Sequence, residues 1–299
     1  MRDVAWIAVD WGTSHLRAWL MRTDGSVIAR RQSADGMGTL DPAGFESALQ
    51  ALCGDALPVP VLACGMVGSR QGWAEAPYAA VPCAPPGAEA ATAAPTTQAG
   101  LSVRILPGVK QVQPADVMRG EETQIAGYLA TNPGFDGVIC LPGTHTKWAH
   151  ISAGEIVSFR TAMTGEMFAL LSGQSVLRHS MGTGWDDAAF EAGVDQAISR
   201  PEGLAASLFS LRAEGLLHGL DPDAARARLS GLLIGAELAS MRPYWLGQQV
   251  ALIGAESLVQ AYATALGAQG VPVAQAPSAE DMTLAGLTAA YTQIFGETA

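Results

Sequence analysis

Short apolar runs alternate with longer helical patterns along most of the chain. Runs with the length of strands buried on both faces lie at residues 4–9, 59–63, 102–106, 137–141 and 249–253. From 16 to 20 the pattern alternates instead, with Leu16, Ala18 and Leu20 on one face and Arg17 and Trp19 on the other. Further strands are expected at 26–31, 155–160 and 271–274.

Apolar residues at helical spacing predict the remaining elements. The first helix covers 42–52, with Asp41 placed to cap it and Pro42 in its first turn. A second helix begins near Gly120, and a short one ends at Leu171. Later helices are expected at 185–198, 201–217, 222–241, 258–266 and 279–295. The last can fold back onto the first half of the chain, and the order of strands and helices predicts an α/β fold.

The first hairpin, which we define as residues 10–14, joins the strands at 4–9 and 16–20. It carries the carboxylate of Asp10, the bare backbone of Gly12 and the hydroxyls of Thr13 and Ser14. Backbone N–H groups and hydroxyls bind phosphate oxygens, and a carboxylate holds Mg²⁺, usually through water. The pattern therefore favours a metal-bound polyphosphate, although an ordinary Asp-x-Gly turn is an alternative interpretation.

A second hairpin of the same design, residues 142–146, follows the strand at 137–141. It contains Gly143, Thr144 and Thr146, with Lys147 close enough to reach a phosphate. The separation of the hairpins, roughly 130 residues, is one domain length and suggests a duplicated fold with a cleft between the halves. Further on, the glycine turn Gly254-Ala255 opens a helix and could lie under a purine or ribose.

Two other stretches carry candidate chemistry. The loop at residues 65–73 follows a buried strand and contains Arg70, which can bind the carboxylate of a small polar molecule in bidentate fashion. A surface loop with an exposed arginine is the alternative. Glu121 and Glu122 lie in the first turn of a helix, either as functional acids or as a well-charged helix start.

Composition narrows the class of protein. A chain of 299 residues with 49% apolar content is long enough for two globular domains. The net charge of −11, without a basic cluster, argues against nucleic-acid or anionic-membrane partners. The four cysteines form no Cys-x-x-Cys pair and are expected to be free thiols in a reducing compartment. With no secretory pattern and no long apolar stretch, we expect a cytoplasmic protein.

The three glycine turns resemble the phosphate-1, phosphate-2 and adenosine motifs of the sugar kinase, heat-shock cognate and actin superfamily. Four longer segments resemble its 2-dehydro-3-deoxygalactonokinase branch. They are GMVGSRQGW at 65–73, MRGEETQ at 118–124, LPGTHTKW at 141–148 and RTAMTGE at 160–166. The resemblance covers essentially the whole chain. Two departures from the common superfamily pattern are Trp11 and Ala255, which stand where smaller residues are frequent.

The resemblance implies an actin-like ATPase fold with two ribonuclease-H-like domains and an interdomain nucleotide cleft. We expect an N-terminal lobe at 1–120 and a C-terminal lobe at 121–299, with the helix at 279–296 packing back on the first. It implies ATP-dependent phosphorylation of the terminal (6-) hydroxyl of 2-dehydro-3-deoxy-D-galactonate, a step in galactonate breakdown. ATP and Mg²⁺ are the implied cofactors, and a homodimer is a possible assembly.

Residue roles follow from the motifs and the resemblance together. Asp10 holds Mg²⁺, and the phosphates meet Gly12, Thr13, Ser14, Gly143, Thr144, Thr146 and Lys147. Gly254 and Ala255 contact the adenosine. Candidates for the base that accepts the sugar proton are Asp116, Glu121 and Glu122, with a preference for Glu122. The acidic end of the sugar meets Arg70 of the loop at residues 65–73, which we call the sugar-acid loop, near Gly36, Ser69, Trp73 and Glu166.

Two alternatives from other classes stay open at this point. An exopolyphosphatase-like phosphohydrolase would share the fold and the paired glutamates of Gly120-Glu121-Glu122, but a polyphosphate tunnel needs more basic residues. A nucleotide-gated binding module, as in actin or the heat-shock ATPases, is disfavoured by the short chain and the polar loop around Arg70.

Overall fold

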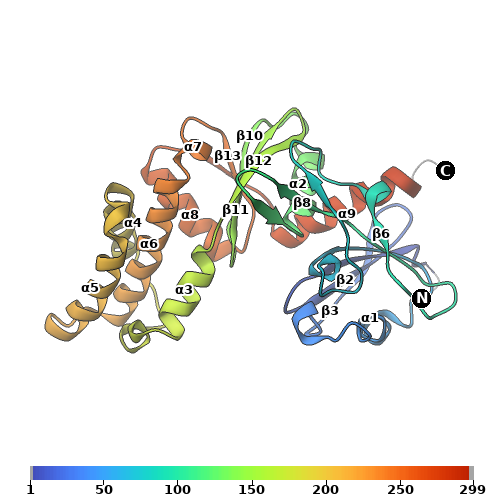
Figure 1. The fold of residues 1–299 in the computed structure, drawn as a ribbon, viewed down its shortest axis with the longest axis horizontal. Coiled ribbons are helices and arrows are strands. Elements are labelled where there is room, and N and C mark those ends of the chain that lie inside the picture. The colour runs from blue at the N-terminus through green and yellow to red at the C-terminus, as the bar shows by residue number, and fades with distance from the viewer. Residues whose placement is uncertain (1–2, 296–299) are drawn as a thin grey trace. The chain divides into compact units, whose positions relative to one another are not determined.

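The computed structural model describes residues 3–295 and divides the chain into two α/β units (Figure 1). Unit 1 comprises the chain up to Phe135, the segment Ile151–Ser158 and the segment from Pro277 onward. Unit 2 comprises Asp136–His150 and Phe159–Ala276. The predicted lobes include residues 1, 2 and 296–299, and the predicted last helix includes residue 296. These residues lie outside the described part of the chain.

Unit 1 is built on a six-stranded sheet in the order β3-β2-β1-β4-β7-β6. Its strands are β1 (Trp6–Trp11), β2 (Leu16–Met21), β3 (Val27–Ser33), β4 (Pro60–Gly65), β6 (Thr92–Ala93) and β7 (Ser102–Ile105). A three-stranded sheet contains β5 (Tyr78–Ala80), β8 (Gly108–Gln111) and β9 (Asp116–Met118). The helices are α1 (Phe45–Cys53), α2 (Glu121–Thr131) and α9 (Ala279–Phe295).

The sheet of unit 2 has the order β12-β11-β10-β13-β14. Its strands are β10 (Gly137–Leu141), β11 (Thr146–Ser152), β12 (Glu155–Ala162), β13 (Val250–Leu252) and β14 (Val273–Gln275). The helices are α3 (Thr164–Gly173), α4 (Asp187–Ser199), α5 (Leu204–Leu217), α6 (Pro222–Ser240), α7 (Arg242–Trp245) and α8 (Glu256–Ala268).

The two large sheets repeat one topology. In each, three consecutive strands lie side by side, and the first of them pairs in parallel with a later strand, β1 with β4 and β10 with β13. A further parallel strand, β7 or β14, continues the sheet. This repetition confirms the prediction of a duplicated, ribonuclease-H-like fold.

The parallel registers position the functional turns. Trp11 pairs with Gly65, so the first hairpin and the sugar-acid loop leave the sheet of unit 1 at the same edge. Cys140 pairs with Leu252, so the second hairpin and the glycine turn at Gly254 leave the sheet of unit 2 at the same edge. Ligands of open α/β sheets bind at such carboxyl ends of parallel strands.

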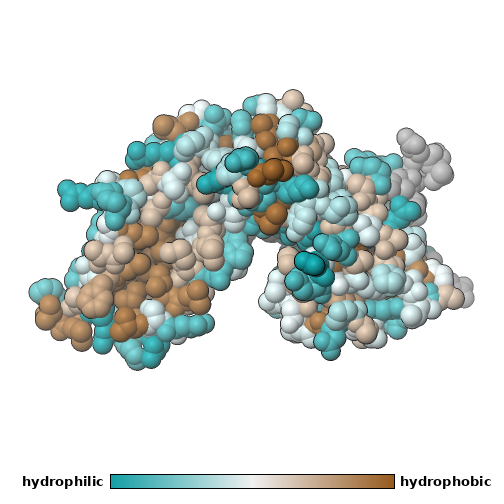
Figure 2. All heavy atoms as spheres, in the orientation of Figure 1, coloured by the Kyte–Doolittle hydropathy of each residue, from teal (hydrophilic) through white to brown (hydrophobic). Residues whose placement is uncertain are grey.

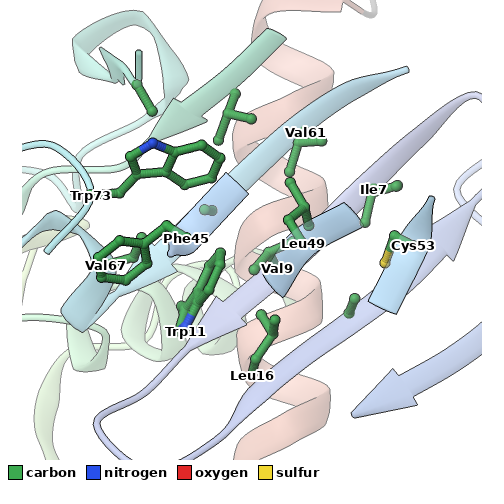
Figure 3. Close-up of a cluster of buried hydrophobic side chains, with 14 of the residues drawn as sticks. Ile7, Val9, Trp11, Leu16, Phe45, Leu49, Cys53, Val61, Val67 and Trp73 are labelled. Carbon is green, nitrogen blue, oxygen red and sulfur yellow. The ribbon is translucent and has the colours of Figure 1, made fainter. Parts of the chain in front are cut away.

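Strand β1 is buried on both faces, and β2 has Leu16, Ala18 and Leu20 on one face and Arg17 and Trp19 on the other, as the sequence predicts. Leu16, Ala18 and Leu20 join one core with α1, and Figure 3 shows part of this cluster. Trp19 belongs to the opposite core, with residues of α9. There Tyr291 of α9 stacks on Trp6 with ring centroids 4.1 Å apart. The predicted return of the last helix to the first half is therefore confirmed.

Three local predictions differ from the structure. The division between units falls after Phe135 rather than at 120, because α2 packs against α9 and stays in unit 1. Helix α1 begins at Phe45 after Gly44, without a side-chain cap, and the carbonyl of Asp41 accepts a turn hydrogen bond from Gly44 N at 2.8 Å. Strands β8 and β9 occupy a region for which we expected no strand.

Three further observations concern the cysteines, the exposed apolar side chains and the length of the helices. The four cysteines are free thiols, and three of them are buried. Figure 2 shows apolar side chains gathered over the helical part of unit 2, where Leu170 of α3 and Phe209, Leu216 and Leu217 of α5 are exposed. In the described part of the chain, the helices are all too short or too polar to cross a bilayer.

Candidate functional site

The first hairpin is a tight turn that a second loop braces. Gly12 N donates to His15 O at 2.9 Å, and the side chains of Thr13 and Ser14 are exposed. Met37 N donates to Gly12 O and Gly38 N to Thr13 O, each at 2.9 Å. A Cβ at Gly36 would lie 2.3 Å from the carbonyl oxygen of Thr13. The predicted substrate residue Gly36 therefore lets the loop pack directly on the turn.

Asp10 lies in β1 and faces an unusual electrostatic environment. Burial raises its pKa, and Arg17, whose Nη1 lies 3.1 Å from Asp10 Oδ2, lowers it. Glu280 and Glu121 raise it further by repulsion, and Glu280 also pairs with Arg17 Nε at 3.2 Å. The result is a carboxylate that a nearby divalent cation would stabilise in its ionised form.

Glu121 and Glu122 open α2 next to this carboxylate. The turn before them needs glycine, since Gly120 has φ +104° and its Cβ position lies 3.5 Å from Gly65 Cα. Both carboxylate oxygens of Glu122 accept from Gly120 N at 2.8 Å, and Glu121 accepts from Arg119 N at 3.0 Å. Glu122 is 1% exposed, whereas Glu121 is half-buried. Burial, and repulsion from Glu121, raise the pKa of Glu122 to about 7.

Asp116, the third predicted base, belongs to a different element from this pair. It begins β9 of the small sheet, opposite Gln111, and accepts a hydrogen bond from Val117 N at 2.9 Å. The interactions that shift the pKa of Asp10 come from Arg17, Glu280 and Glu121, not from Asp116. The electrostatics thus bring Asp10, Glu121 and Glu122 together.

The sugar-acid loop presents one charged side chain and buries its aromatic one. Arg70 is exposed. Trp73 is 8% exposed, donates from Nε1 to Pro95 O at 3.0 Å and packs against Trp11 and Phe45 (Figure 3). The structure gives Trp73 a packing role in the core, and a contact with substrate stays a prediction.

Polar atoms without partners lie beneath the same loop. Ser69 Oγ and two guanidinium nitrogens of Arg119, Nε and Nη1, are buried and have no hydrogen-bond partner. The third, Nη2, donates to Ala76 O at 2.8 Å, and the guanidinium lies over the ring of Tyr78. Buried donors without partners are rare, so they mark a place that a water or a polar ligand completes.

The second hairpin leaves its backbone open and is braced by α3. Nothing lies within 4 Å of a Cβ position at Gly143, and Thr144 is exposed. A Cβ at Gly165 would lie 2.2 Å from Gly143 O, and Glu166 N donates to Thr144 O at 2.9 Å. The side chain of Glu166 lies 2.5 Å from His145 Nε2. Glu166, predicted near the sugar acid, thus belongs to unit 2.

Two predicted phosphate ligands of the second hairpin are buried instead of exposed. Thr146 is 0% exposed and its Oγ1 lies 3.0 Å from Tyr262 OH. Lys147 is 4% exposed, and its Nζ donates to His145 O at 3.2 Å. The accessible groups of this turn are therefore Gly143, Thr144 and His145, and phosphate contacts of Thr146 and Lys147 stay predictions.

A cavity of about 560 Å³ opens beside the second hairpin within unit 2. Its walls are mostly apolar and come from the hairpin, α3, α6, α8 and the loop before α4. They include Gly143, Phe168, Trp185, Arg226, Ile234 and Ser257. Gly254 and Ala255 end directly before α8, which supplies one wall. The volume is in the range of small-molecule sites.

Sequence reasoning missed most of this cavity. Trp185 directly follows Gly182-Thr183-Gly184, a pattern that could have marked a binding loop. Glu237 is a single acid in the apolar second half of α6, and such an isolated buried charge is a signal for function. Phe168 and Arg226, whose guanidinium lies 5.0 Å from the ring centroid, carry no sequence signal that we can name.

Comparison with known proteins finds close relatives over nearly the whole chain. A family model described as 2-keto-3-deoxy-galactonokinase matches residues 10–290. A protein of Rhizobium meliloti (strain 1021), named as a probable 2-dehydro-3-deoxygalactonokinase, is 41% identical over 299 residues, covering 96% of this chain and 97% of that protein. The 2-dehydro-3-deoxygalactonokinase of Escherichia coli (strain K12) is 37% identical, covering 90% of this chain and 91% of that protein.

Solved structures agree with the fold. A crystal structure from Sinorhizobium meliloti, to which the same activity is ascribed, has a TM-score of 0.89 and 39% identity, covering 97% of this chain and 99% of that chain. Component A of the Acidaminococcus fermentans (R)-2-hydroxyglutaryl-CoA dehydratase has a TM-score of 0.52 at 15% identity, covering 96% of this chain and 98% of that chain. The second likeness concerns the fold alone, which is that of actin-like ATPases and sugar kinases.

Proposed function

The chain belongs to the 2-keto-3-deoxy-galactonokinase family, and from this premise we propose how its residues carry out the reaction. The protein is a sugar-acid kinase that phosphorylates 2-dehydro-3-deoxy-D-galactonate with ATP, a step of galactonate catabolism. The proposal is that the γ-phosphoryl group is transferred to the terminal (6-) hydroxyl. The oxygen of that hydroxyl attacks phosphorus, its proton leaves to a base, and ADP departs.

The observation that carries the proposal is the pair of glutamates that opens α2 near Asp10, where burial and repulsion from Glu121 raise the pKa of Glu122 to about 7. A general base works best when its pKa lies near the operating pH. Glu122 is therefore proposed as the acceptor of the sugar proton. Glu121, which is more accessible, is proposed to bind Mg²⁺ together with Asp10. Asp116 ranks below the two glutamates because it is not among the groups that shift the pKa values of Asp10 and Glu122.

Both hairpins are proposed to contribute ligands for the triphosphate. On the first, the exposed groups are the hydroxyls of Thr13 and Ser14, and Gly12 is half-buried at the start of the turn. On the second, the open backbone at Gly143 and the hydroxyl of Thr144 support the same role. The adjacent cavity of unit 2 is proposed to take the nucleoside, with Gly254 and Ala255 at the start of the helix that lines it.

The acidic environment of the first hairpin fits Mg²⁺. Asp10 has a raised pKa because it is buried and lies near Glu121 and Glu280, and a divalent cation would relieve that repulsion. The described residues hold no group of three or more His, Cys, Asp or Glu side chains that could bind a metal alone. Mg²⁺ usually takes one or two carboxylates together with substrate phosphates. Asp10 and Glu121 would hold the ion, which neutralises charge on the triphosphate.

The sugar acid is proposed to bind at the sugar-acid loop. The exposed guanidinium of Arg70 can pair with its carboxylate. The partnerless Ser69 Oγ and the nearby Arg119 support a polar ligand at this place. Gly36, Trp73 and Glu166 complete the proposed set: Gly36 and Trp73 through the packing of the loop, and Glu166 as an acceptor for a sugar hydroxyl.

One assay tests the function. ADP formation is measured with Mg²⁺–ATP alone and with a panel of 2-keto-3-deoxy sugar acids. We expect release only with an acid of this class, most rapidly with 2-dehydro-3-deoxy-D-galactonate. Equal ADP release without any sugar acid, or hydrolysis of polyphosphate, would contradict the proposal.

The proposal also covers the cellular compartment and the oligomeric state. The free cysteines support a reducing compartment such as the cytoplasm. The exposed apolar side chains on α5 support a homodimer. Light scattering on the purified protein tests the second point, and a mass of one chain would exclude the dimer.

A further inference from the structure

Glu237 is a buried acid that the proposed reaction does not use. It lies on α6 and is 5% exposed. Burial raises its pKa, and the interactions that lower it come from the neutral donors Thr164, Trp148 and Tyr262. A carboxylate in such a place costs free energy unless its oxygens are well satisfied. Its presence at this point therefore calls for a role.

The three donors come from three different elements. Trp148 of β11 donates from Nε1 to Glu237 Oε1 at 2.7 Å. Tyr262 of α8 donates to Oε2 at 2.8 Å, and the hydroxyl of Thr164, the first residue of α3, contacts the same oxygen. One side chain thus ties a strand and two helices to α6.

The network continues into the second hairpin. Tyr262 OH lies 3.0 Å from Thr146 Oγ1. A phenol has one O–H group. Tyr262 donates it to the Glu237 carboxylate, so the Tyr262 oxygen accepts a hydrogen bond from Thr146 Oγ1. The hydroxyl proton of Thr146 therefore points into the protein and not toward a phosphate. Thr146 and Trp148 are both anchored, so the end of the turn is held on two sides.

The same residues border the accessible parts of the nucleotide site. Thr164 and Tyr262 line the cavity of unit 2. Gly165, next to Thr164, packs against Gly143 O, and Glu166 N donates to Thr144 O. A shift of α3 would therefore move Gly143 and Thr144, and a shift of Tyr262 would change the cavity wall.

We propose that Glu237 is a positioning residue, which fixes the second hairpin relative to α3 and α8 so that the hairpin is preorganised for the triphosphate. The inference rests on the proposed role of this hairpin in ATP binding. It adds that the carboxylate acts through Trp148, Thr164 and Tyr262 and touches neither substrate. Its effect should thus appear in the use of ATP and not in the use of the sugar acid.

Glu237→Gln is the size-matched test. A carboxylate offers only acceptors, whereas glutamine places an NH₂ donor among groups that already donate. We expect KM for ATP to rise about tenfold, as for the loss of one or two hydrogen bonds, with KM for the sugar acid within about twofold of the original. Hydrogen exchange of residues 142–148 without ligand should also become faster.

Ile198→Ala is the matched control for a loss of packing. Ile198 is 6% exposed and lies in the core of unit 2, at the end of α4 away from its cavity residues Asp187 and Phe190. This variant should unfold at a lower temperature while both KM values stay unchanged. A purely structural Glu237 would behave in the same way.

Tyr262→Phe cuts one link and keeps the ring. It should raise KM for ATP in the same direction, and the double variant with Glu237→Gln should be no worse than about the larger single effect, because the two residues act in one network. The inference is overturned if Glu237→Gln is folded and keeps KM for ATP within about twofold, or if both KM values rise equally. Failure of the unaltered protein to form ADP would instead count against the proposed function.

Discussion

The two hairpins share one design but differ in where their carboxylates lie. In the first, Asp10 stands two residues before Gly12, and Glu121 raises its pKa. In the second, the position two residues before Gly143 is Leu141. The acids near this turn are Glu166, which pairs with His145, and the buried Glu237, which accepts from Trp148. Each turn is braced by a glycine of another segment, Gly36 or Gly165.

The difference indicates that the two hairpins of the duplicated fold have different functions. The acidic side chains around the first hairpin suit a metal and a proton acceptor, which act on the reacting atoms. The second hairpin presents neutral donors beside a mostly apolar cavity, which suits binding of the nucleotide. Changes of the acids around the first hairpin should therefore lower turnover, and changes at the second hairpin should weaken the use of ATP.

The largest effect is expected at Glu122. Glu122→Gln removes the proton acceptor and should lower kcat by about 10²–10⁴-fold, the usual contribution of a general base. Glu121→Gln and Asp116→Asn are the matched controls and should lose less. Steady-state ADP formation measures all three. A greater loss in Glu121→Gln would transfer the role to the more accessible glutamate.

Asp10→Asn tests the acidic side of the comparison next. The asparagine keeps the shape but loses the charge, so the Mg²⁺ concentration for half-maximal rate should rise by about 10–100-fold. Titration of the rate with Mg²⁺ at fixed ATP measures the shift. An unchanged Mg²⁺ requirement would remove Asp10 from the metal site.

Gly36→Ala and Gly165→Ala form a matched pair. Each new Cβ would lie within about 2.3 Å of a hairpin backbone oxygen, so the turn must move, and such overpacking costs about 1–3 kcal/mol. Gly165→Ala should raise KM for ATP despite the better helix propensity of alanine, while Gly36→Ala should mainly lower kcat. If both variants changed kcat and KM for ATP in the same way, the two hairpins would not differ in function.

Arg70→Ala should affect only the sugar acid. Loss of a charged hydrogen-bonding partner should raise its KM by about tenfold or more and leave KM for ATP unchanged. Initial rates at varied concentrations of each substrate separate the two constants. A sugar-acid KM equal to that of the unaltered protein would exclude Arg70 from the site.

A further effect, on stability and not on kinetics, is a pH dependence of the free energy of unfolding. The pKa of Glu122 is raised from 4.5 to about 7, so the folded state binds more protons than the unfolded state in this window and stability falls as pH rises through it. Glu122→Gln should therefore be more stable than the unaltered protein at about pH 8, by at most about 3 kcal/mol, with little difference near pH 4. Thermal unfolding at both pH values checks this sign, and an equal difference at the two would refute it.

The sequence predicts the frame of the molecule better than its side-chain contacts. Apolar runs and glycine turns predict the strands around both hairpins, because burial on both faces leaves a strong local pattern. Burial of Thr146, Lys147 and Trp73 could not be predicted, since it depends on helices and loops distant in sequence. For the same reason the link of Glu237 to the second hairpin, which spans 89 residues to Trp148, leaves no local sign.

A calorimetric titration of Glu122→Gln with ATP in the presence of Mg²⁺ tests this difference in function between the two hairpins most directly. The account predicts that this variant binds ATP with a Kd within about twofold of the unaltered protein while its turnover is almost lost. A loss of ATP affinity as large as the loss of turnover would contradict it, because Glu122 would then serve nucleotide binding as well.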